Sequence, residues 1–337
     1  MKILFYHTTC PHPYTVRSFA NTALGGTESS LLRVAHEFAA RGHTVYLAEQ
    51  HFTQNEEIDG VHYVTLETAH RLHDLDFAVL LQNMRGAPEF AEYFPKAKKF
   101  LWFHNMPSKY LYRYKALFLK TGMELIGVSD FHAARIKKRV ESGFYSRIKS
   151  FFGINQAVPV HCIYNSISAD FKPMNAVVDP NKLISMSAPT KGLDLTLQVF
   201  ARIKQRLPAL RLYVARPWVS DIGELPEGVT FLGALPQAEL RKHVAESLCV
   251  FYPQWKRVET FGLVYAEANA IGTPFLAHPL GAAPEVLSNP CQLVNGQNDE
   301  ELIEKIREWQ EKRPAVWLKD EFKLANVMRA WESLLKL

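Results

Sequence analysis

The sequence has few cysteines and lacks long hydrophobic runs. Its four cysteines are scattered over 337 residues, and none forms a C-x-x-C pair, so a reducing compartment is the simplest interpretation. No apolar run approaches the roughly 20 residues that a transmembrane helix needs. The opening MKILFYHTTCPHP has an apolar run too short for the core of a secretory signal. We therefore expect a cytoplasmic protein, or one peripheral at the inner face of the cell membrane.

The chain also lacks a strong charge imbalance. Its formal net charge of +5 suits an anionic small molecule, a membrane surface or weak nucleic-acid contact, and it does not choose among them. Hydrophobic residues make up 47% and charged residues 22%, which is the composition of a folded protein and excludes a disordered one. A length of 337 residues exceeds one ordinary core and suits two domains.

Strand-like and helix-like segments alternate along the sequence. A buried strand at 2–7 is followed by a glycine-containing turn, a helical pattern at 31–39, a stop at Gly42 and a strand at 44–49. This order is a strand–helix–strand unit with parallel strands. Strands of the same kind recur at 76–83, 100–105, 124–130, 159–166, 182–189, 210–217, 229–233, 248–253 and 273–278. The predicted fold class is α/β, with two Rossmann-like domains whose parallel sheets face a cleft between them.

A stretch with little periodicity and two prolines, 169–182, predicts the boundary between the two sets. We place an N-terminal domain at 1–168 and a C-terminal domain at 178–317, and an amphipathic helix ends the chain within 318–337. Ligands of such sheets bind at the carboxyl ends of the strands. Functional residues are therefore expected in the loops that face the cleft.

Two glycines, Gly25 and Gly26, directly precede the first long helix together with Thr27. Their lack of side chains lets the backbone approach an anion, and the helix N-terminus offers amide groups to a phosphate. The alternative is a tight turn that only starts the helix.

The stretch ETFGLVYAE places Glu259 and Glu267 on either side of an apolar run. A helix that begins near Gly262 would present amides at the sequence Phe261–Leu263, next to Thr260, for a phosphate or a sugar hydroxyl. Carboxylates accept hydrogen bonds from pairs of hydroxyl groups, so a sugar and a ribose are natural ligands for the two acids. The alternative is a capping acid followed by an acid on the helix surface.

Several blocks along the chain share their order with one enzyme family. These are GGTESSLLRVAHEFAARGHTV, GVSDFHAARI, CIYNSISADFKP, TKGLDLTLQVFARI, VTFLGALPQAEL and GTPFLAHPLGAAPEVL, together with an E-x7-E motif at Glu259 and Glu267. The chain resembles a retaining GT-B glycosyltransferase of the glycosyltransferase family 4 type over nearly its whole length. The resemblance implies that the C-terminal helix packs back on the N-terminal domain.

The resemblance also implies roles for individual residues. Glu259 would contact the hydroxyls of the donor sugar, Glu267 would hold the nucleotide ribose, and Lys191 would neutralise the diphosphate leaving group. The backbone of the Phe261–Leu263 segment would contact sugar and phosphate, and Gly25 and Gly26 would contact the diphosphate. The site residues that it implies are Glu259, Lys191 and His104 for catalysis, Gly25, Gly26, Thr260, Phe261, Gly262, Leu263, Glu267 and Arg257 for the donor, and Asn105 and Asn165 for the acceptor and the linker.

One position departs from the family pattern. The family places an arginine about five residues before the lysine, where this chain has Met186 or Ser187. One cation fewer near a diphosphate reduces stabilisation of the charge that develops on it. Arg257, Lys256 or Arg216 could replace it, or each could be an ordinary solvated surface charge.

The resemblance implies a reaction with retention, in which an acceptor hydroxyl attacks on the face that the nucleotide diphosphate leaves. No cofactor or essential metal is expected. The partners would be a UDP- or GDP-linked sugar and a glycan or lipid-linked acceptor of cell-surface polysaccharide biosynthesis. Two other possibilities stay open, namely a nucleotide-sugar hydrolase or epimerase on the same fold and a catalytically idle nucleotide-sugar binder.

Two short motifs suggest metals without strong support. Asp74–Asp76 spells D-x-D but precedes a strand, at the edge of the sheet opposite to the ligands, and it therefore more simply faces solvent. His7, Cys10 and His12 offer three zinc ligands with no evident fourth, so a loop is the simpler interpretation. The predicted site contains no metal.

Two basic stretches with aromatic residues, 109–120 and 135–153, lie in the N-terminal domain. Such segments suit an anionic membrane surface or an anionic glycan, or they are solvated helices with aromatics that face the core. Nucleic acid is not expected, since no nucleic-acid-binding module accompanies the charge.

Overall fold

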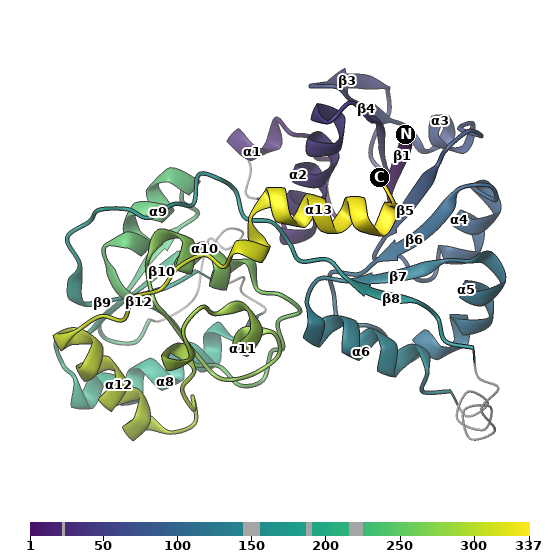
Figure 1. Ribbon diagram of the computed structural model, residues 1–337. Helices are drawn as coiled ribbons and strands as arrows, with labels where there is room; N and C mark the ends of the chain where they lie inside the picture. The colour runs from purple at the N-terminus through teal and green to yellow at the C-terminus, as the bar shows by residue number, and fades with distance from the viewer. Residues whose placement is uncertain (22–23, 144–155, 187–190, 216–224) are drawn as a thin grey trace. The chain divides into compact units, whose positions relative to one another are not determined.

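The computed structural model describes residues 1–21, 24–143, 156–186, 191–215 and 225–337. The chain divides into two compact units (Figure 1). Unit 1 comprises Met1–Ser166 and Leu324–Leu337, and unit 2 comprises Ile167–Lys323. The stretch 169–182, predicted as the domain boundary, therefore lies in unit 2, and its last residues enter the first strand of that unit.

Unit 1 contains an eight-stranded sheet in the order β3-β4-β2-β1-β5-β6-β7-β8. All neighbouring strands are parallel except β3, which pairs antiparallel with β4 at the edge. The alternation of strands and helices predicts only parallel strands, so this short edge hairpin is a correction. The strands are β1 Lys2–His7, β2 Thr44–Glu49, β3 Glu56–Ile58, β4 Val61–Val64, β5 Phe77–Leu81, β6 Lys98–Trp102, β7 Glu124–Gly127 and β8 Val160–Cys162.

Both faces of this sheet are covered. The helices of unit 1 are α1 Ser18–Asn21, α2 Gly26–Ala40, α3 Leu66–His70, α4 Ala87–Tyr93, the 3-10 helix η1 Leu111–Tyr114, α5 Lys115–Thr121, α6 Asp130–Val140 and α13 Leu324–Leu335. Leu4 and Tyr6 of β1 belong to the core cluster that contains residues of α3, α4, α5 and α6. Phe5 points to the other face, where its ring meets Phe38 of α2 and Trp331 of α13. Side chains alternate between the faces of a strand, so one strand serves both layers.

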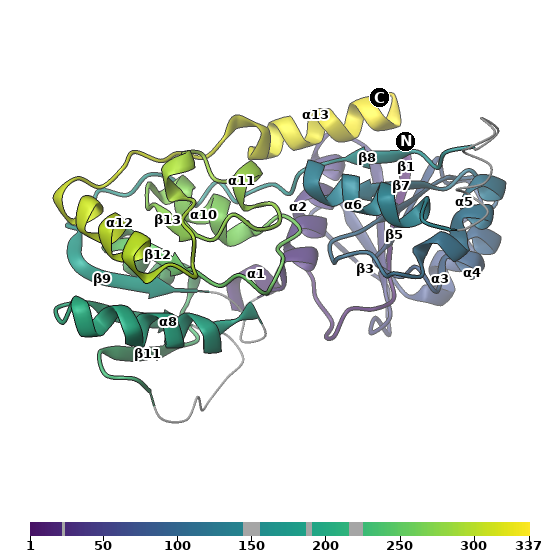
Figure 2. The ribbon, with the colours of Figure 1, turned by 90° about the horizontal axis from the view of Figure 1, so that it is seen from below.

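The last helix, α13, lies beside α2 on the sheet of unit 1 (Figures 1 and 2). Its Trp331 is fully buried and packs edge-on against Trp102 of β6, with ring centroids 5.0 Å apart. Arg41, at the end of α2, forms an ion pair of 2.6 Å with Glu332. An apolar contact and a half-exposed ion pair thus attach the end of the chain to the unit that contains its beginning.

Unit 2 contains a five-stranded parallel sheet in the order β11-β10-β9-β12-β13. Its elements are β9 Asp179–Ser185, α8 Leu193–Arg206, β10 Arg211–Ala215, β11 Val229–Gly233, α9 Gln237–Ala245, β12 Ser247–Tyr252, α10 Leu263–Ile271, β13 Phe275–Ala277, α11 Ala283–Val286, η3 Pro290–Gln292, α12 Asp299–Glu311 and η4 Asp320–Phe322. Figure 1 shows α8 and α12 side by side, and both belong to the core cluster of this sheet. Helix α9 contacts α10 and β12.

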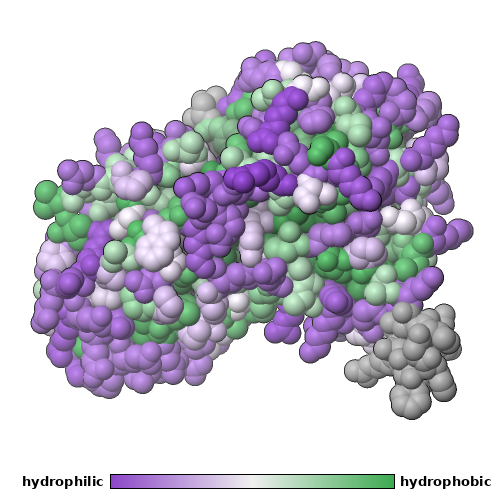
Figure 3. Space-filling model, in the orientation of Figure 1, coloured by the Kyte–Doolittle hydropathy of each residue, from purple (hydrophilic) through white to green (hydrophobic). Residues whose placement is uncertain are grey.

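No helix among the described residues is both long and apolar enough to cross a membrane. Figure 3 shows hydrophilic residues over most of the visible face of each unit, with smaller hydrophobic patches among them.

We predict that Trp331→Ala destabilises unit 1 by about 3–5 kcal/mol, because it removes the largest side chain that joins α13 to the sheet and leaves a cavity. Urea unfolding followed by far-ultraviolet circular dichroism measures the effect. Trp317→Ala is the control, since the Trp317 side chain is 54% exposed. Equal unfolding midpoints for the two variants would show that the α13 contact contributes little.

Candidate active site

In unit 2 the fully buried strand β12 leads into a short loop that one glutamine side chain fixes. Gln254, which is 3% exposed, accepts hydrogen bonds from the backbone amides of Lys256 at 3.0 Å and Arg257 at 2.7 Å. Its amide nitrogen donates to the carbonyl oxygen of Arg257 at 2.8 Å. These bonds fold the backbone around a buried amide and leave the side chains of Lys256 and Arg257 exposed.

After this loop, Glu259 and Lys191 meet. Lys191 Nζ lies 2.8 Å from Glu259 Oε2, although 68 positions separate the two residues. Glu259 is only 6% exposed, and a carboxylate so buried requires a partner. The side chain of Lys191 is 46% exposed, so the cation remains within reach of solvent and of a ligand. The pair is therefore a buried carboxylate held by an accessible cation.

Tyr252, the last residue of β12, holds this pair in place. Its hydroxyl donates to the carbonyl oxygen of Lys191 at 2.8 Å and lies 3.4 Å from Glu259 Oε1. Tyr252 is 2% exposed, and its ring packs edge-on against Tyr265 of α10. One phenol thus orients the lysine backbone and the glutamate carboxylate together.

Helix α10 begins directly after this cluster. Gly262 is its N-cap with φ 79° and ψ 72°, a left-handed conformation, and no side chain caps the helix. A Cβ at Gly262 would lie 2.4 Å from the Tyr265 ring, so both the space and the backbone require glycine. Phe261 is buried against Phe322, with ring centroids 5.1 Å apart, and Glu267 lies half-buried in the second turn. The first amide groups of an α-helix have no acceptor within the helix, so a helix start of this kind can donate hydrogen bonds to an anion.

A turn that follows β13 packs against the backbone of Glu259. The amide of Ala282 donates to the carbonyl oxygen of Glu259 at 3.1 Å. A Cβ added to Gly281, where φ is 67°, would lie 2.6 Å from that same oxygen. Gly281 lies in the block GTPFLAHPLGAAPEVL, but sequence reasoning does not single it out, and it misses Tyr252 and Gln254 as well. Only the order of the strands brings these residues to Glu259.

In unit 1 a chain of hydrogen bonds links Thr27, at the start of α2, to the segments that follow β5 and β6 and to α6. Gln82 follows β5 and donates from Nε2 to Thr27 Oγ1 of α2 at 2.6 Å. Asn105, which follows β6, donates from its side-chain amide to Gln82 Oε1. The Asn105 carbonyl oxygen lies 3.0 Å from His132 Nε2 of α6. Gln82 has φ 54°, an uncommon conformation for a residue with a side chain. It is a residue that the sequence analysis missed.

His104 lies next to this chain but is buried. It is 7% exposed, and its ring centroid is 4.5 Å from that of Trp102. Burial lowers the pKa of His104 well below its usual range, and the nearby His132 and His7 lower it further. Burial likewise lowers the pKa of His132 to about 4. His104 is therefore a neutral imidazole at physiological pH, suited to hydrogen bonding and not to balancing an anion.

The remaining predicted residues differ in their surroundings. Asn165 is 5% exposed, and within the part of the chain that the structure describes its Oδ1 has no hydrogen-bond partner. Met186, at the place of the family arginine, is buried at the end of β9. Ser187 and Arg216 lie outside the described residues, as does most of the basic stretch 135–153.

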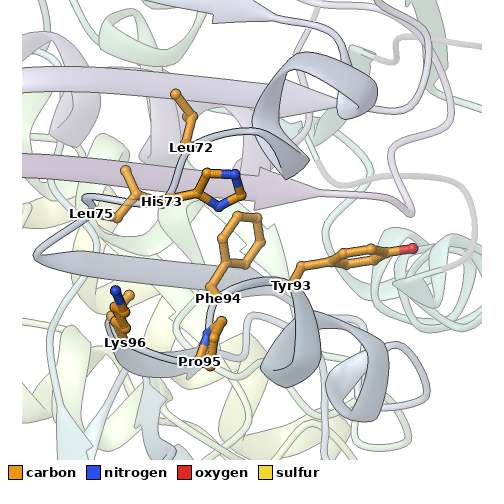
Figure 4. A pocket seen from close by; sticks show the side chains of 8 residues that line it. Leu72, His73, Leu75, Tyr93, Phe94, Pro95 and Lys96 are labelled. Atoms are coloured by element: carbon orange, nitrogen blue, oxygen red, sulfur yellow. The ribbon is translucent and has the colours of Figure 1, made fainter.

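A pocket of about 140 Å³ lies away from all these groups, at the amino ends of β5 and β6 in unit 1. Figure 4 shows His73 beside Phe94, with Leu72 and Leu75 at its wall. Asp74 nearby forms an ion pair with Lys2, and both Asp74 and Asp76 are exposed. The two aspartates of the D-x-D motif thus face solvent before a strand, as predicted. The pocket lies at the amino ends of the strands, whereas ligands of parallel sheets bind at the carboxyl ends.

Comparisons with solved structures decide the fold. A glycosyltransferase from Rickettsia africae aligns with 99% of this chain and 97% of its own at a TM-score of 0.66 and 15% identity. The catalytic domain of starch synthase IV from Arabidopsis thaliana, bound to ADP and acarbose, aligns with 99% of this chain and 97% of its own at a TM-score of 0.61 and 12% identity. The chain has the GT-B fold.

The family comparison concerns unit 2. Residues 183–312 match the family "Glycosyl transferases group 1". A GDP-mannose-dependent alpha-(1-6)-phosphatidylinositol monomannoside mannosyltransferase from Mycolicibacterium smegmatis is 32% identical over 118 residues, 31% of each chain. A D-inositol 3-phosphate glycosyltransferase from Segniliparus rotundus is 33% identical over 114 residues, 30% of this chain and 25% of its own. The chain thus matches less than a third of the length of these relatives. The family match includes Lys191, Glu259 and Glu267.

We predict that Gly281→Ala destabilises unit 2 more than Gly272→Ala does. Both glycines have a left-handed backbone, which costs an alanine about 1–2 kcal/mol. Only at Gly281 would the new Cβ also collide with the Glu259 backbone, whereas at Gly272 nothing lies within 4 Å. Urea unfolding of both variants measures the difference in their free energies of unfolding. Equal losses of stability would show that the turn at Gly281 can rearrange without disturbing Glu259.

Proposed function

We propose that this protein is a retaining glycosyltransferase that moves a sugar from a UDP- or GDP-linked donor to a glycan or lipid-linked acceptor without an essential metal. The 2.8 Å pair of Lys191 and the buried Glu259, close in sequence to the amino end of α10, is its main support. A sugar diphosphate could bind such a pair through both of its parts, the diphosphate at the cation and the sugar hydroxyls at the carboxylate. The match of residues 183–312 to the glycosyltransferase group supports the same reading.

In this proposal each group of the pair has its own task. Lys191 and the amino end of α10 stabilise the negative charge on the departing diphosphate, since oriented dipoles and a cation act strongly in a partly dry site. Glu259 accepts hydrogen bonds from the donor sugar, and Glu267 accepts them from the ribose. Tyr252 keeps the lysine backbone and the glutamate at a fixed spacing. The backbone at Thr260 and at Phe261–Leu263 completes the contacts to the donor.

From the family resemblance we also propose roles for residues of unit 1. Gly25 and Gly26 contact the diphosphate, and Asn105 and Asn165 belong to the acceptor side and the linker. His104, kept neutral by burial, orients the acceptor or a sugar hydroxyl through a hydrogen bond. The acceptor hydroxyl enters on the face that the diphosphate leaves, and a phosphate oxygen takes its proton. This route needs no protein nucleophile.

Arg257 is the residue that we propose in place of the family arginine. Met186 cannot contribute charge and is buried. Arg257 is exposed on a loop whose backbone Gln254 fixes, two residues before Glu259. Its guanidinium can therefore turn toward an anion without any change of the backbone. Lys256, next to it, is the second choice.

The carboxyl group of Glu267 provides the first test. In a thermal-shift panel of UDP, GDP, ADP and their sugar conjugates, we expect one nucleotide family to raise the melting temperature of the wild type, because a ligand of the folded state stabilises it by mass action. Glu267→Ala should lose most of that shift. Glu304→Ala, which removes an exposed glutamate of α12 in the same unit, should keep it.

Turnover then separates the possible reactions. Consumption of the matching sugar nucleotide that requires an added acceptor, and that Lys191→Met abolishes, supports a transferase. Consumption that acceptor does not change would instead indicate a hydrolase or an epimerase. If no nucleotide raises the melting temperature of the wild type, the proposed donor site is wrong and a catalytically idle protein is the better explanation.

The stretch 109–120 is our candidate for contact with an anionic membrane surface. Lys109 and Arg113 are exposed and lie over the ring of Tyr110, at 5.0 and 4.6 Å from its centroid. Tyr110 itself is 44% exposed. Lys115 is different, because it is buried and paired with Glu141, so it is not available to a surface. A phosphatidylinositol mannosyltransferase among the relatives supports an acceptor at a membrane.

We predict that the double variant Lys109→Glu and Arg113→Glu loses most binding to vesicles that contain phosphatidylglycerol. Each basic residue near such a surface contributes about 1 kcal/mol. Co-sedimentation at low and high salt measures the loss. The control reverses two exposed charges at the amino end of the sheet, Arg71 and Lys96. If both double variants bind the vesicles equally well, binding depends on the net charge of the protein and not on the segment 109–120.

A further inference from the structure

A buried thiol, a buried carboxylate and an exposed imidazole come together at the carboxyl ends of β1 and β2 in unit 1. Cys10 belongs to the loop after β1, Glu49 is the last residue of β2, and His51 follows two positions later. One ligand atom from each of the three lies within 4.8 Å of the other two. The sequence pointed to His7, Cys10 and His12 instead, but His7 is occupied by Tyr14, with His7 Nδ1 2.9 Å from the phenol oxygen.

Glu49 gives an independent reason to expect a ligand. It is 0% exposed, and its Oε2 accepts from the Cys10 thiol at 3.0 Å and from the His51 amide at 2.7 Å. Its Oε1 is buried and, among the described residues, has no hydrogen-bond partner. Leaving a carboxylate oxygen buried in this way is costly. A bound cation would satisfy it.

The three ligand types select the metal. Thiolate sulfur and imidazole nitrogen are poor ligands for Mg²⁺ and Ca²⁺ and good ones for zinc-like ions. A thiolate and a carboxylate together balance the two charges of Zn²⁺, so the complex is neutral and suits a buried place. At Zn–ligand distances of about 2.0–2.3 Å, ligand atoms lie roughly 3.5 Å apart, so the present cluster needs movements of about one ångström.

The surroundings of the cluster are already arranged for such a site. His51 Nε2 lies 3.0 Å from the Cys10 carbonyl oxygen, and Gln50 Nε2 donates to the same oxygen at 2.6 Å. The imidazole is thus folded back over the cysteine. The Cys10 thiol donates a hydrogen bond to the Glu49 carboxylate.

We propose that Cys10, Glu49 and His51 bind one zinc ion, which replaces the thiol proton and ties the loop after β1 to the end of β2. Three protein ligands leave a fourth position for water. The ion would fix the segment that leads toward the glycine turn at Gly25. It takes no part in the transfer reaction proposed above, and its existence does not depend on that reaction.

Cobalt provides a direct readout of the cysteine ligand. The full chain, freed of any affinity tag and stripped with a chelator, is titrated with Co²⁺ and then with Zn²⁺ against a coloured chelator. We expect one Co²⁺ per chain with a near-ultraviolet sulfur-to-cobalt absorption band, and displacement by Zn²⁺. Zn²⁺ should also raise the melting temperature, because it binds only the folded chain.

Two variants and two controls test the assignment. Cys10→Ser should abolish the band, and His51→Ala should weaken binding by more than about 100-fold, beyond the effect usual for residues outside the ligand shell. His51 is exposed, so its loss leaves the core intact. His62→Ala removes a surface histidine that pairs with Glu57 at 3.3 Å, and Cys291→Ser removes another thiol; neither should matter. A missing band in the wild type, or one that survives Cys10→Ser, would overturn the site and leave a simple thiol–carboxylate hydrogen bond.

Discussion

Burial of both faces of a parallel sheet is the constraint on which most of this structure depends. Strands that run the same way need a crossover for every step, and the crossovers supply the helices that cover both faces. In β1 this makes Leu4 and Tyr6 pack against one helical layer and Phe5 against the other. It also brings the carboxyl ends of all these strands to one edge. The residues that we propose for the site lie at that edge, on loops or at the starts of the helices that follow them.

Hydrogen bonds from glutamine side chains fix the conformation of those loops. Gln254 fixes the turn that carries Lys256 and Arg257, and Gln82 connects the α2 turn to the segment after β6. Gly262 and Gly281 adopt left-handed conformations at places where a Cβ would collide with a neighbour. A buried amide costs free energy unless every donor and acceptor is satisfied, and this is why such residues rigidify a loop once they are paired.

The two acids of the E-x7-E motif have different environments. Glu259 is buried and paired with a cation, whereas Glu267 is half-buried on the helix that follows. Tyr252, at the end of β12, contacts both Glu259 and the backbone of Lys191. The geometry of this ion pair therefore does not depend on long flexible side chains alone. Loss of Lys191 would leave the buried Glu259 carboxylate without its cation, and an uncompensated buried charge is costly. This gives Lys191 and Glu259 a structural importance besides their proposed role.

The sequence by itself determined the order of strands and helices, because hydrophobic periodicity is a local property. The strands at 2–7 and 44–49 and the glycine stop at Gly42 are found where they were predicted. It also pointed to Glu259, Lys191 and the glycine turns, since a motif needs only letters in order. Their roles remain proposals.

Only the tertiary structure decided which distant residues meet. Lys191 reaches Glu259, Gln82 reaches Thr27, and Cys10 meets Glu49 and His51. The short edge strand β3, the burial of Lys115 and the supporting contact of Gly281 also had no local signal. Each depends on the register and order of strands, which long-range packing fixes and which no spacing along the chain encodes.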